Sequence, residues 1–307
     1  MVTAEFVRSV RVRVPAKINL YLGVGALRAD GFHELATVFQ GVELYDEVTA
    51  TPAPSRTLHT SGTGAAVLPT GPENLAWRAA SLLAERAGVD TDVHLEIAKS
   101  IPVSGGMAGG SADAAATLLA CATLWQTGST KSELLALAAE LGSDVPFAMM
   151  GGTALGTGRG ETLTPVLTTG HFHWVLALAA FGIGTADTYR ELDRRRADAP
   201  VTGTPALPTG LLDALRAGDP HRLGPTLAND LQPAALALAP TLRRTLAAGM
   251  DLGAIASIVS GSGPTCAFLC ADSEAATRLA AALAAEGVCR TTRVATGPAP
   301  GARVMSG

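Results

Sequence analysis

A glycine-rich stretch between a strand pattern and a helix pattern constrains the fold more than any other part of the sequence. Residues 102–116 read PVSGGMAGGSADAAA. Before them, Val93–Ile97 alternates apolar and polar residues, which is typical of a half-buried strand. After them, Asp113–Trp125 is rich in the helix formers Ala and Leu. A strand, a glycine-rich loop and a helix in this order can gather backbone N–H groups around an anion, so the sequence predicts a phosphate-binding loop.

This loop matches neither of two common nucleotide-binding motifs. No Gly-Lys-Ser/Thr ends it, which excludes a Walker A loop. Gly106 and Gly109 have the spacing of the last two glycines in the dinucleotide fingerprint, but the glycine two residues earlier is missing. A hydride-transferring enzyme is therefore disfavoured. The loop alone fits a flexible turn capped by Ser111 equally well.

Length and charge narrow the classes of partner. The chain has 307 residues, of which 48% are hydrophobic, enough for two domains with buried cores. Its net charge of −4 disfavours nucleic acid as a partner, because no overall positive field would attract a polyanion. An anionic substrate must therefore be held by local donors.

The rest of the sequence indicates a soluble protein of the reducing cytoplasm with no membrane partner. The start of the chain has no apolar signal core, and no apolar run approaches the roughly 18 residues of a membrane span. The cysteines have neither metal-ligand spacing nor the pattern of a secreted disulfide framework, so we expect buried free thiols. They are Cys121, Cys266, Cys270 and Cys289.

A strand near the start carries a Lys and an Asn on one face. Val10–Val14 alternates apolar and basic residues, and Pro15 then requires an edge position or a bend. The alternation resumes with the other parity, which puts Lys17 and Asn19 on the same side, about 7 Å apart. Together they could address one anionic group. A solvated polar face is the alternative.

Asp144 follows a predicted helix that ends at Gly142. Pro146 suits the first turn of another short helix, with Asp144 as its N-cap residue. A carboxylate at a helix N-terminus is also held in place for chemistry. Both interpretations stay open at this point.

The second half of the chain predicts mixed elements around another glycine loop. Ser260–Thr265 lies between two short strands and precedes a final helix and strand. Arg194–Gly210 predicts a loop whose basic run is solvated, and Leu211–Ala248 predicts two or three helices broken at prolines. A domain boundary is expected near residue 170.

Three stretches taken together carry more information than any one of them. They are PAKINL at residues 15–20, PVSGGMAGGSADAA at residues 102–115 and GSGPT at residues 261–265. In order and spacing the chain resembles the GHMP kinase superfamily over essentially its whole length. ADGFHEL (residues 29–35) and LGSDVPF (residues 141–147) resemble the members that phosphorylate a cytidine diphosphate-linked polyol in isoprenoid biosynthesis.

The resemblance implies a two-domain α+β fold. Residues 1–170 would form the ATP-binding domain, similar to domain 2 of ribosomal protein S5, and residues 171–307 a ferredoxin-like substrate-side domain. ATP and the substrate would meet in the cleft between them. The resemblance also implies a monomer or a homodimer.

The same resemblance implies roles for individual residues. Asp144 would be the base and Lys17 its cationic partner, while Phe32, His33 and Tyr189 would hold the cytosine ring. ATP would contact Asn74 on the adenine side and Pro102, Val103, Ser104, Gly105, Gly106, Met107, Ala108, Gly109, Gly110, Ser111 and Ala112. Substrate contacts would also include Asn19, Lys99, Thr185, Gly261, Ser262 and Gly263. Magnesium would accompany ATP, with no residue assigned as its ligand.

The central loop departs from the pattern of many relatives. Met107 and Ala108 replace a Leu-Gly pair, Ala112 replaces a Ser, and Phe32 stands where many relatives have Tyr. Close approach of the phosphates should survive, because Ala has the smallest side chain with a Cβ. Two alternatives stay open, namely a homoserine- or mevalonate-type kinase and a nucleotide-binding regulator without activity.

Overall fold

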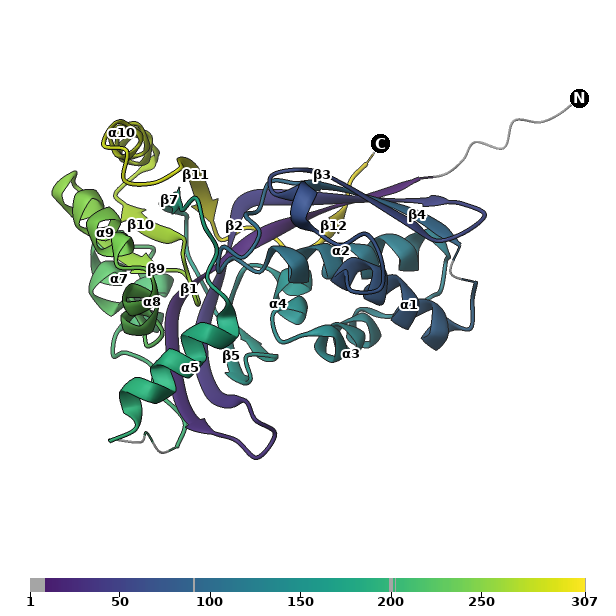
Figure 1. Ribbon diagram of the computed structural model, residues 1–307, viewed down its shortest axis with the longest axis horizontal. Coiled ribbons are helices and arrows are strands. Elements are labelled where there is room, and N and C mark those ends of the chain that lie inside the picture. The colour runs from purple at the N-terminus through teal and green to yellow at the C-terminus, as the bar shows by residue number, and fades with distance from the viewer. Residues whose placement is uncertain (1–8, 91, 199–200, 202, 307) are drawn as a thin grey trace, which may run out of the picture.

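The chain builds two β-sheets covered by helices (Figure 1). The computed structural model describes residues 9–90, 92–198, 201 and 203–306. The first sheet runs in the order β12-β1-β2-β4-β3, with β5, β6 and β8 attached to it. Its main strands are β1 (Val10–Leu27), β2 (His33–Pro52), β3 (Thr57–Gly62), β4 (Val93–Lys99), β5 (Thr153–Gly158) and β6 (Thr162–Pro165).

The two longest strands, β1 and β2, form a hairpin that extends from the first sheet toward the helices of the second half of the chain (Figure 1). An Asp-Gly turn joins them, and Gly31 has the positive φ of 83° that such a turn favours. The pairing of β1 with β2 shifts register between Pro15 and Ala16. Pro15 therefore stands at an irregularity, as its missing N–H donor requires.

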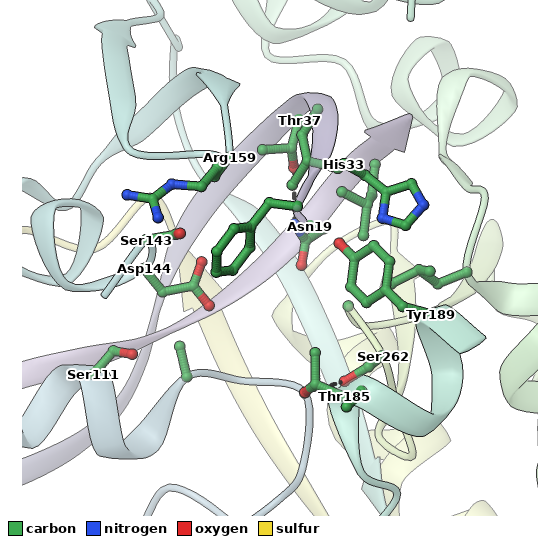
Figure 2. A pocket seen from close by; sticks show the side chains of 18 of the residues that line it. Asn19, His33, Thr37, Ser111, Ser143, Asp144, Arg159, Thr185, Tyr189 and Ser262 are labelled. Carbon is green, nitrogen blue, oxygen red and sulfur yellow. Dashed lines mark hydrogen bonds between the residues drawn. The ribbon is translucent and has the colours of Figure 1, made fainter. Parts of the chain in front are cut away.

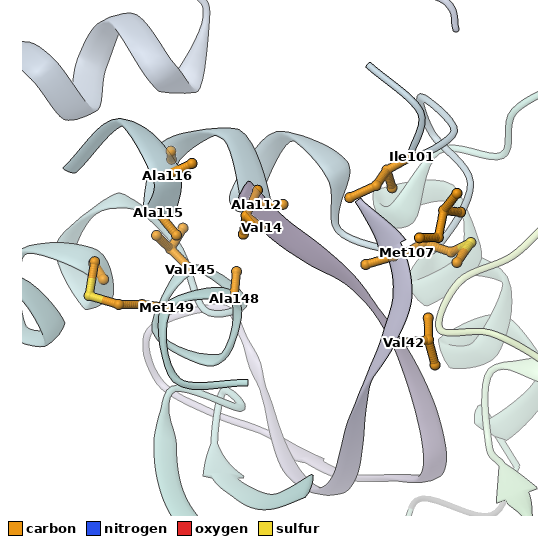
Figure 3. Packing of buried hydrophobic residues seen from close by; sticks show 14 of the residues in the cluster. Val14, Val42, Ile101, Met107, Ala112, Ala115, Ala116, Val145, Ala148 and Met149 are labelled. Atoms are coloured by element: carbon orange, nitrogen blue, oxygen red, sulfur yellow. The ribbon is translucent and has the colours of Figure 1, made fainter. Parts of the chain in front are cut away.

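Four helices cover the first sheet. They are α1 (Leu75–Ala87), α2 (Gly109–Leu124), α3 (Lys131–Leu141) and α4 (Val145–Met150). Alanines let α2 pack closely against its neighbours. Figure 3 shows Ala112, Ala115 and Ala116 of α2 beside Val14 of β1 and near Val145 and Ala148 of α4. This helix follows the glycine-rich loop directly, so its packing fixes where the loop ends.

The second sheet is antiparallel and lies after residue 170, in the order β11-β7-β10-β9. Its strands are β7 (Phe172–Leu178), β9 (Ala256–Val259), β10 (Cys266–Cys270) and β11 (Thr291–Gly297). Its helices are α5 (Thr185–Arg196), α6 (Leu211–Ala217), α7 (Pro220–Leu223), α8 (Gln232–Leu238), α9 (Thr241–Asp251) and α10 (Ser273–Ala285). The expected arrangement of helices on an antiparallel sheet is confirmed.

The late part of the chain also returns to the first sheet. β8 (Ala228–Asn229) pairs in parallel with β1, and β12 (Arg303–Val304) pairs antiparallel with it. The β12 pairing was not predicted, because two residues give no periodic pattern. The division at residues 170 and 171 stays a prediction, and these two strands cross it.

Three sequence expectations are wrong in detail. Where two or three helices were expected from Leu211 onward, the described residues form four, α6 to α9. α2 begins at Gly109 with Ala108 as its N-cap residue, so Ser111 lies within the first turn and does not cap it. The expected loop over Arg194–Gly210 is partly helical, because Arg194–Arg196 form the end of α5. Arg196 is not merely solvated, since its guanidinium donates to Asp230 Oδ2 at 2.9 Å. Residues 199, 200 and 202 of this loop lie outside the described residues.

The cysteines are free thiols, as predicted. Cys121, Cys266 and Cys270 are buried, and burial raises the pKa of the Cys121 thiol to about 12. Such thiols are poor nucleophiles at neutral pH. Within the described residues, no helix combines the length and the apolar character that a membrane crossing needs.

Candidate active site

One cavity of about 800 Å³ lies where the first sheet and its helices meet the second half of the chain. Its walls come from the β1–β2 hairpin, the glycine-rich loop, the residues before α4, the start of α5 and the second glycine loop (Figure 2). Segments far apart in sequence therefore face one space. The long β1–β2 hairpin makes this arrangement possible, because it carries residues of the first sheet toward α5.

The glycine-rich loop presents backbone N–H groups at one end of the cavity. Ser104, Gly106 and Ala108 have positive φ angles of 51°, 73° and 57°, and a chain that alternates in this way can turn successive amides toward an anion. Gly109, Gly110 and Ser111 follow as the first turn of α2, where N–H groups have no partner within the helix. The helix dipole adds to their attraction for phosphate.

The second glycine loop locks the first in place. A Cβ at Gly106 would lie 2.2 Å from the Ser260 carbonyl oxygen, so only glycine fits there. The Ser260 hydroxyl donates to the Gly106 carbonyl oxygen at 3.1 Å. A Cβ at Gly261 would lie 3.3 Å from Lys17 Nζ. The two loops and Lys17 are thus in close contact.

Gly109 and Gly110 face different surroundings. A Cβ at Gly109 would contact Ile101 at 3.2 Å and Lys99 Nζ at 3.3 Å, so it would point into the protein. A Cβ at Gly110 would meet no protein atom within 4 Å, and Gly110 lines the cavity. Gly110, rather than Gly109, is therefore the position where a side chain would occupy the phosphate space.

Lys17 and Asp144 meet on the wall of this cavity. Lys17 Nζ lies 3.6 Å from Asp144 Oδ2, and the two side chains are 9% and 33% exposed. Lys17 Nζ also donates to Asn19 Oδ1 at 2.8 Å, and Asn19 Nδ2 donates to Thr37 Oγ1 at 2.8 Å. This chain of hydrogen bonds fixes the ammonium, so it is positioned before any ligand binds.

Asp144 occupies the N-cap position of α4 but makes no capping hydrogen bond with its side chain. The position at the helix start was predicted, and the capping role is absent. The carboxylate is free to face Lys17 and the cavity instead, next to Ser143 (Figure 2). A carboxylate beside an ammonium at a helix N-terminus can accept a proton or orient a hydroxyl group.

Aromatic side chains form the other end of the cavity. The Tyr189 ring stacks on the His33 ring with 5.2 Å between their centroids and 25° between their planes. Phe32 is exposed, and the Arg159 guanidinium lies 4.8 Å from its ring centroid. Burial, followed by the nearby carboxylates of Asp144 and Asp193, raises the pKa of the Tyr189 phenol above its ordinary range. Tyr189 therefore stays protonated and can donate a hydrogen bond.

The start of α5 is tied to the second glycine loop. Thr185 Oγ1 lies 3.0 Å from Ser262 Oγ, and both residues line the cavity. Thr188 donates from its hydroxyl to the Ser262 carbonyl oxygen at 3.3 Å. The helix that carries Tyr189 is thereby linked to the loop that contacts Lys17.

Lys99 is buried beneath the glycine-rich loop and does not line the cavity. It was expected to contact substrate or phosphate, but its side chain is 1% exposed and its ammonium is paired with Asp46 and Asp113. The Asp113 contact is 2.6 Å, and Asp46 also accepts from the backbone N–H groups of Ser100 and Ile101. Lys99 therefore acts beneath the loop, where it joins β2, β4 and α2.

Several other expected contacts lie outside the cavity. Asn74 caps α1 by accepting from the Ala76 N–H, and its amide donates to the Pro69 carbonyl oxygen. Met107 and Ala112 are buried in the core, and the Ala112 N–H is used within α2. Val103 and Gly263 do not line the cavity either. Their proposed contacts with ATP or substrate stay predictions.

Sequence reasoning missed Thr37, Ser143, Arg159 and Asp193, which all line or support the cavity. Ser143 adjoins Asp144 and could have been included with it. Asp193 lies four residues after Tyr189, the spacing of one helix face, which is the signal that could have found it. Arg159 follows a strand in a glycine-rich turn and carries no such signal.

Comparison with known families agrees with this geometry. The family described as GHMP kinases N terminal domain matches residues 74–152, and GHMP kinases C terminal matches residues 211–289. A 4-diphosphocytidyl-2-C-methyl-D-erythritol kinase of Mycolicibacterium gilvum (strain PYR-GCK) is 59% identical over 97% of the chain and 93% of that protein. The chain belongs to the GHMP kinase family. As a GHMP kinase it is an ATP-dependent phosphotransferase.

Other relatives of this GHMP kinase have the same description. The 4-diphosphocytidyl-2-C-methyl-D-erythritol kinase of Rhodococcus jostii (strain RHA1) is 57% identical over 97% of the chain and 96% of that protein. The crystal structure of a 4-(cytidine 5'-diphospho)-2C-methyl-D-erythritol kinase superimposes with a TM-score of 0.76 at 36% identity, covering 93% of this chain and 98% of that one.

More distant GHMP kinases share the fold alone. The L. major mevalonate kinase in complex with R-mevalonate gives a TM-score of 0.75 at 17% identity, over 94% of this chain and 95% of that one. The two-domain α+β fold expected from the sequence is therefore confirmed.

Proposed function

We propose that this GHMP kinase transfers the γ-phosphoryl group of ATP to the 2-hydroxyl of 4-diphosphocytidyl-2-C-methyl-D-erythritol, giving the 2-phosphate and ADP. This is a step of the non-mevalonate route to isoprenoid precursors. The names of relatives at 57% to 59% identity support this substrate. The observation that carries the proposal is one cavity with three parts: an amide-lined loop, the Lys17–Asp144 pair and an aromatic end at His33 and Tyr189.

The amide-lined end fits the triphosphate of ATP. The loop from Ser104 to Ala108 and the first turn of α2 supply N–H donors, and Gly110 leaves the space open. Lys17 lies close to the second glycine loop, which contacts the first. A γ-phosphoryl group held by the loop would therefore lie toward Lys17 and Asp144.

The chemistry requires an alcohol oxygen to attack phosphorus while negative charge is spread over the transferred group. Asp144 would orient the hydroxyl and accept its proton as the oxygen–phosphorus bond forms. Lys17 would stabilise the charge on the transferred group, and Asn19 would keep the ammonium in position. ADP leaves with the electron pair of the broken phosphorus–oxygen bond.

Magnesium fits this site as a companion of ATP rather than as a resident ion. Among the described residues, no group of three His, Cys, Asp or Glu side chains could hold a metal. Mg²⁺ is commonly bound through one or two protein oxygens together with substrate phosphates. Ser104 and Ser111 of the loop both line the cavity and would supply oxygen donors to the ion. When bound, Mg²⁺ would neutralise phosphate charge.

The aromatic end fits a pyrimidine. Phe32 and Tyr189 offer flat faces, and His33 offers a polar ring edge. Arg159, which lies over Phe32, places a positive charge where a diphosphate linker would pass toward Asp144. We also propose that the enzyme works in the cytoplasm, which the free thiols support, and that it is a monomer or a homodimer.

The test is turnover of the purified protein with ATP and 4-diphosphocytidyl-2-C-methyl-D-erythritol, followed by ADP release and by phosphorus NMR of the product. Homoserine, mevalonate and the cytidine-free 2-C-methyl-D-erythritol 4-phosphate serve as comparison acceptors. We expect turnover of the cytidylylated acceptor alone. Preferential turnover of homoserine or mevalonate would assign a different alcohol. ATP binding with no turnover of any acceptor would indicate a regulator.

A further inference from the structure

One face of α5 fixes both the plane and the rotation of the His33 ring. Tyr189 and Asp193 are four residues apart on this helix, so their side chains lie on the same face. The Tyr189 ring stacks on His33, and Asp193 Oδ1 lies 2.8 Å from His33 Nε2. The His33 side chain is 8% exposed, whereas that of Asp193 is 50% exposed. A ring held at its face and at one nitrogen has little freedom to turn.

The partner of Nε2 decides what the other ring nitrogen can do. A carboxylate accepts hydrogen bonds and does not donate them, so Nε2 must carry the hydrogen in this contact. In neutral imidazole, Nδ1 then has no hydrogen and acts as an acceptor. Within the described part of the chain, the bond to Asp193 is the hydrogen bond that the His33 ring makes, and His33 lines the cavity.

We propose that Asp193 is a positioning residue that holds His33 in the Nε2–H form, so that Nδ1 accepts a hydrogen bond from an amino group of the substrate base. This inference rests on the proposed function. A 4-aminopyrimidine such as cytosine has an amino donor where the corresponding 4-oxopyrimidine, uracil, has a carbonyl acceptor. Two acceptors facing each other repel, so this contact would select a cytidine diphosphate ester over a uridine diphosphate ester.

The experiment compares two substrates that differ only at this position of the base. Values of kcat and KM are measured for the cytidylylated acceptor and its uridylylated counterpart. The variants are the unaltered protein, Asp193→Asn and a matched control, Glu191→Gln. Glu191 is on the same helix and pairs with Arg194, so its replacement changes helix charge without touching His33. An Asn amide can donate to Nε2, which would move the ring hydrogen to Nδ1.

We expect the unaltered protein to prefer the cytidine substrate by about 10-fold to 100-fold in kcat/KM, the size of one mismatched hydrogen bond. Asp193→Asn should reduce this preference to within about threefold, through the KM of the cytidine substrate, with kcat and the KM for ATP nearly unchanged. Glu191→Gln should keep the preference. An equal loss for both substrates, or a loss in kcat alone, would overturn the specificity role.

A second measurement does not depend on turnover. Nitrogen-15 NMR of ring-labelled histidine distinguishes nitrogens that carry hydrogen from those that do not, and the His33 signals are assigned by their loss in His33→Asn. We expect hydrogen on Nε2 in the unaltered protein and a change of this pattern in Asp193→Asn. Hydrogen on Nδ1 in the unaltered protein would overturn the inference. If neither pyrimidine substrate is turned over, the proposed function fails while the ring assignment is still decided.

Discussion

At the level of single residues, the proposed chemistry depends on the contact between Lys17 and Asp144. We expect Asp144→Asn to lower kcat by about 10²-fold to 10⁴-fold, the usual effect of losing a proton-transfer group. Its melting temperature should stay close to that of the unaltered protein, because the Asp144 side chain caps nothing. Steady-state kinetics and calorimetry measure both. Near-native turnover in Asp144→Asn would remove this residue from the mechanism.

A control for Asp144→Asn is available on a neighbouring helix. Glu140 lies on α3 and pairs with Arg86 at the surface, with 48% of its side chain exposed. Glu140→Gln removes one carboxylate outside the cavity, and surface pairs of this kind contribute little to stability. Its kcat should therefore equal that of the unaltered protein, which separates local chemistry from a change in overall charge.

His33 should affect one substrate and spare the other. His33→Ala removes the polar ring edge at the aromatic end of the cavity, so the KM for the cytidylylated acceptor should rise about 10-fold to 100-fold. The KM for ATP should not change, because the glycine-rich loop lies at the other end. Initial rates with each substrate varied in turn measure both constants. A variant that loses affinity for ATP alone would contradict the assignment of His33 to the base.

Sequence reasoning predicted that Lys17 and Asn19 lie together, but not the environment of every residue. Lys17 and Asn19 share a strand face, and alternation alone was enough to place them together. Lys99 also lies near the loop in sequence, yet its ammonium is buried and forms an ion pair with Asp46 of β2. A long-range ion pair leaves no local pattern, so this burial could not be predicted.

At the level of elements, the two adjacent glycines at the start of α2 should respond differently to substitution. Gly110→Val places a side chain in open space at the phosphate end, so ATP affinity should fall about 10-fold or more with little loss of stability. Gly109→Val is directed at Ile101 and Lys99, so its main effect should be a lower melting temperature. Titration calorimetry with ATP and thermal unfolding distinguish the two. Unchanged ATP affinity in Gly110→Val would contradict the assignment of phosphate binding to the glycine-rich loop.

The buried ion cluster that joins β2, β4 and α2 predicts a dependence of stability on pH. Burial, partly offset by the Lys99 charge and reinforced by Asp46, raises the pKa of the Asp113 carboxyl from 3.8 to about 8. Between pH 3.8 and about pH 8, the Asp113 carboxyl therefore holds a proton in the folded state that it releases in the unfolded state. The contribution of Asp113 to stability is therefore complete below about pH 4 and is lost as the pH rises to about 8.

Urea unfolding at several pH values between about 5 and 10 tests this linkage. Relative to Asp113→Asn, the free energy of unfolding of the unaltered protein should fall with rising pH, by up to about 1.4 kcal/mol per pH unit below pH 8. Above pH 9 the two curves should run parallel. Parallel curves over the whole range would show that Asp113 does not retain its proton.

Most elements followed from local patterns, and the exceptions have physical causes. The alternation in β1 and β4 is a property of neighbouring residues, and it is confirmed. The capping box of Thr130 with Glu133 at the start of α3 is equally local. The start of α2 was placed four residues late, because glycines have low helix propensity and Ala108 is an unusual cap. Packing of α2 in the core overrides that preference.

At the level of the whole molecule, the segment after β11 joins the second sheet to α4 and β1. The Ala302 N–H donates to Ala148 of α4 at 3.0 Å, and the Met305 N–H donates to Arg11 of β1 at 2.8 Å. Because α4 begins directly after Asp144, deletion of residues 302–307 should lower the melting temperature by about 5–10 °C and reduce kcat several-fold. Differential scanning calorimetry and kinetics below the transition measure this.

A shorter deletion provides the control. Removal of residues 306 and 307 leaves β12 and the Met305 hydrogen bond intact, so both properties should match those of the unaltered protein. If the longer deletion were equally harmless, β12 would be dispensable and α4 would be held by its other contacts alone.

The pairing of β12 with β1 has a consequence for how the protein is made. Translation runs from the N-terminus, so Val12 emerges from the ribosome well before its neighbour Val304. Until Arg303 and Val304 emerge, the backbone groups of Val12 and Arg13 on that side are unpaired, and an unpaired strand edge is a site where other strands can attach. This part of the β1 edge is therefore covered only after Arg303 and Val304 have left the exit tunnel.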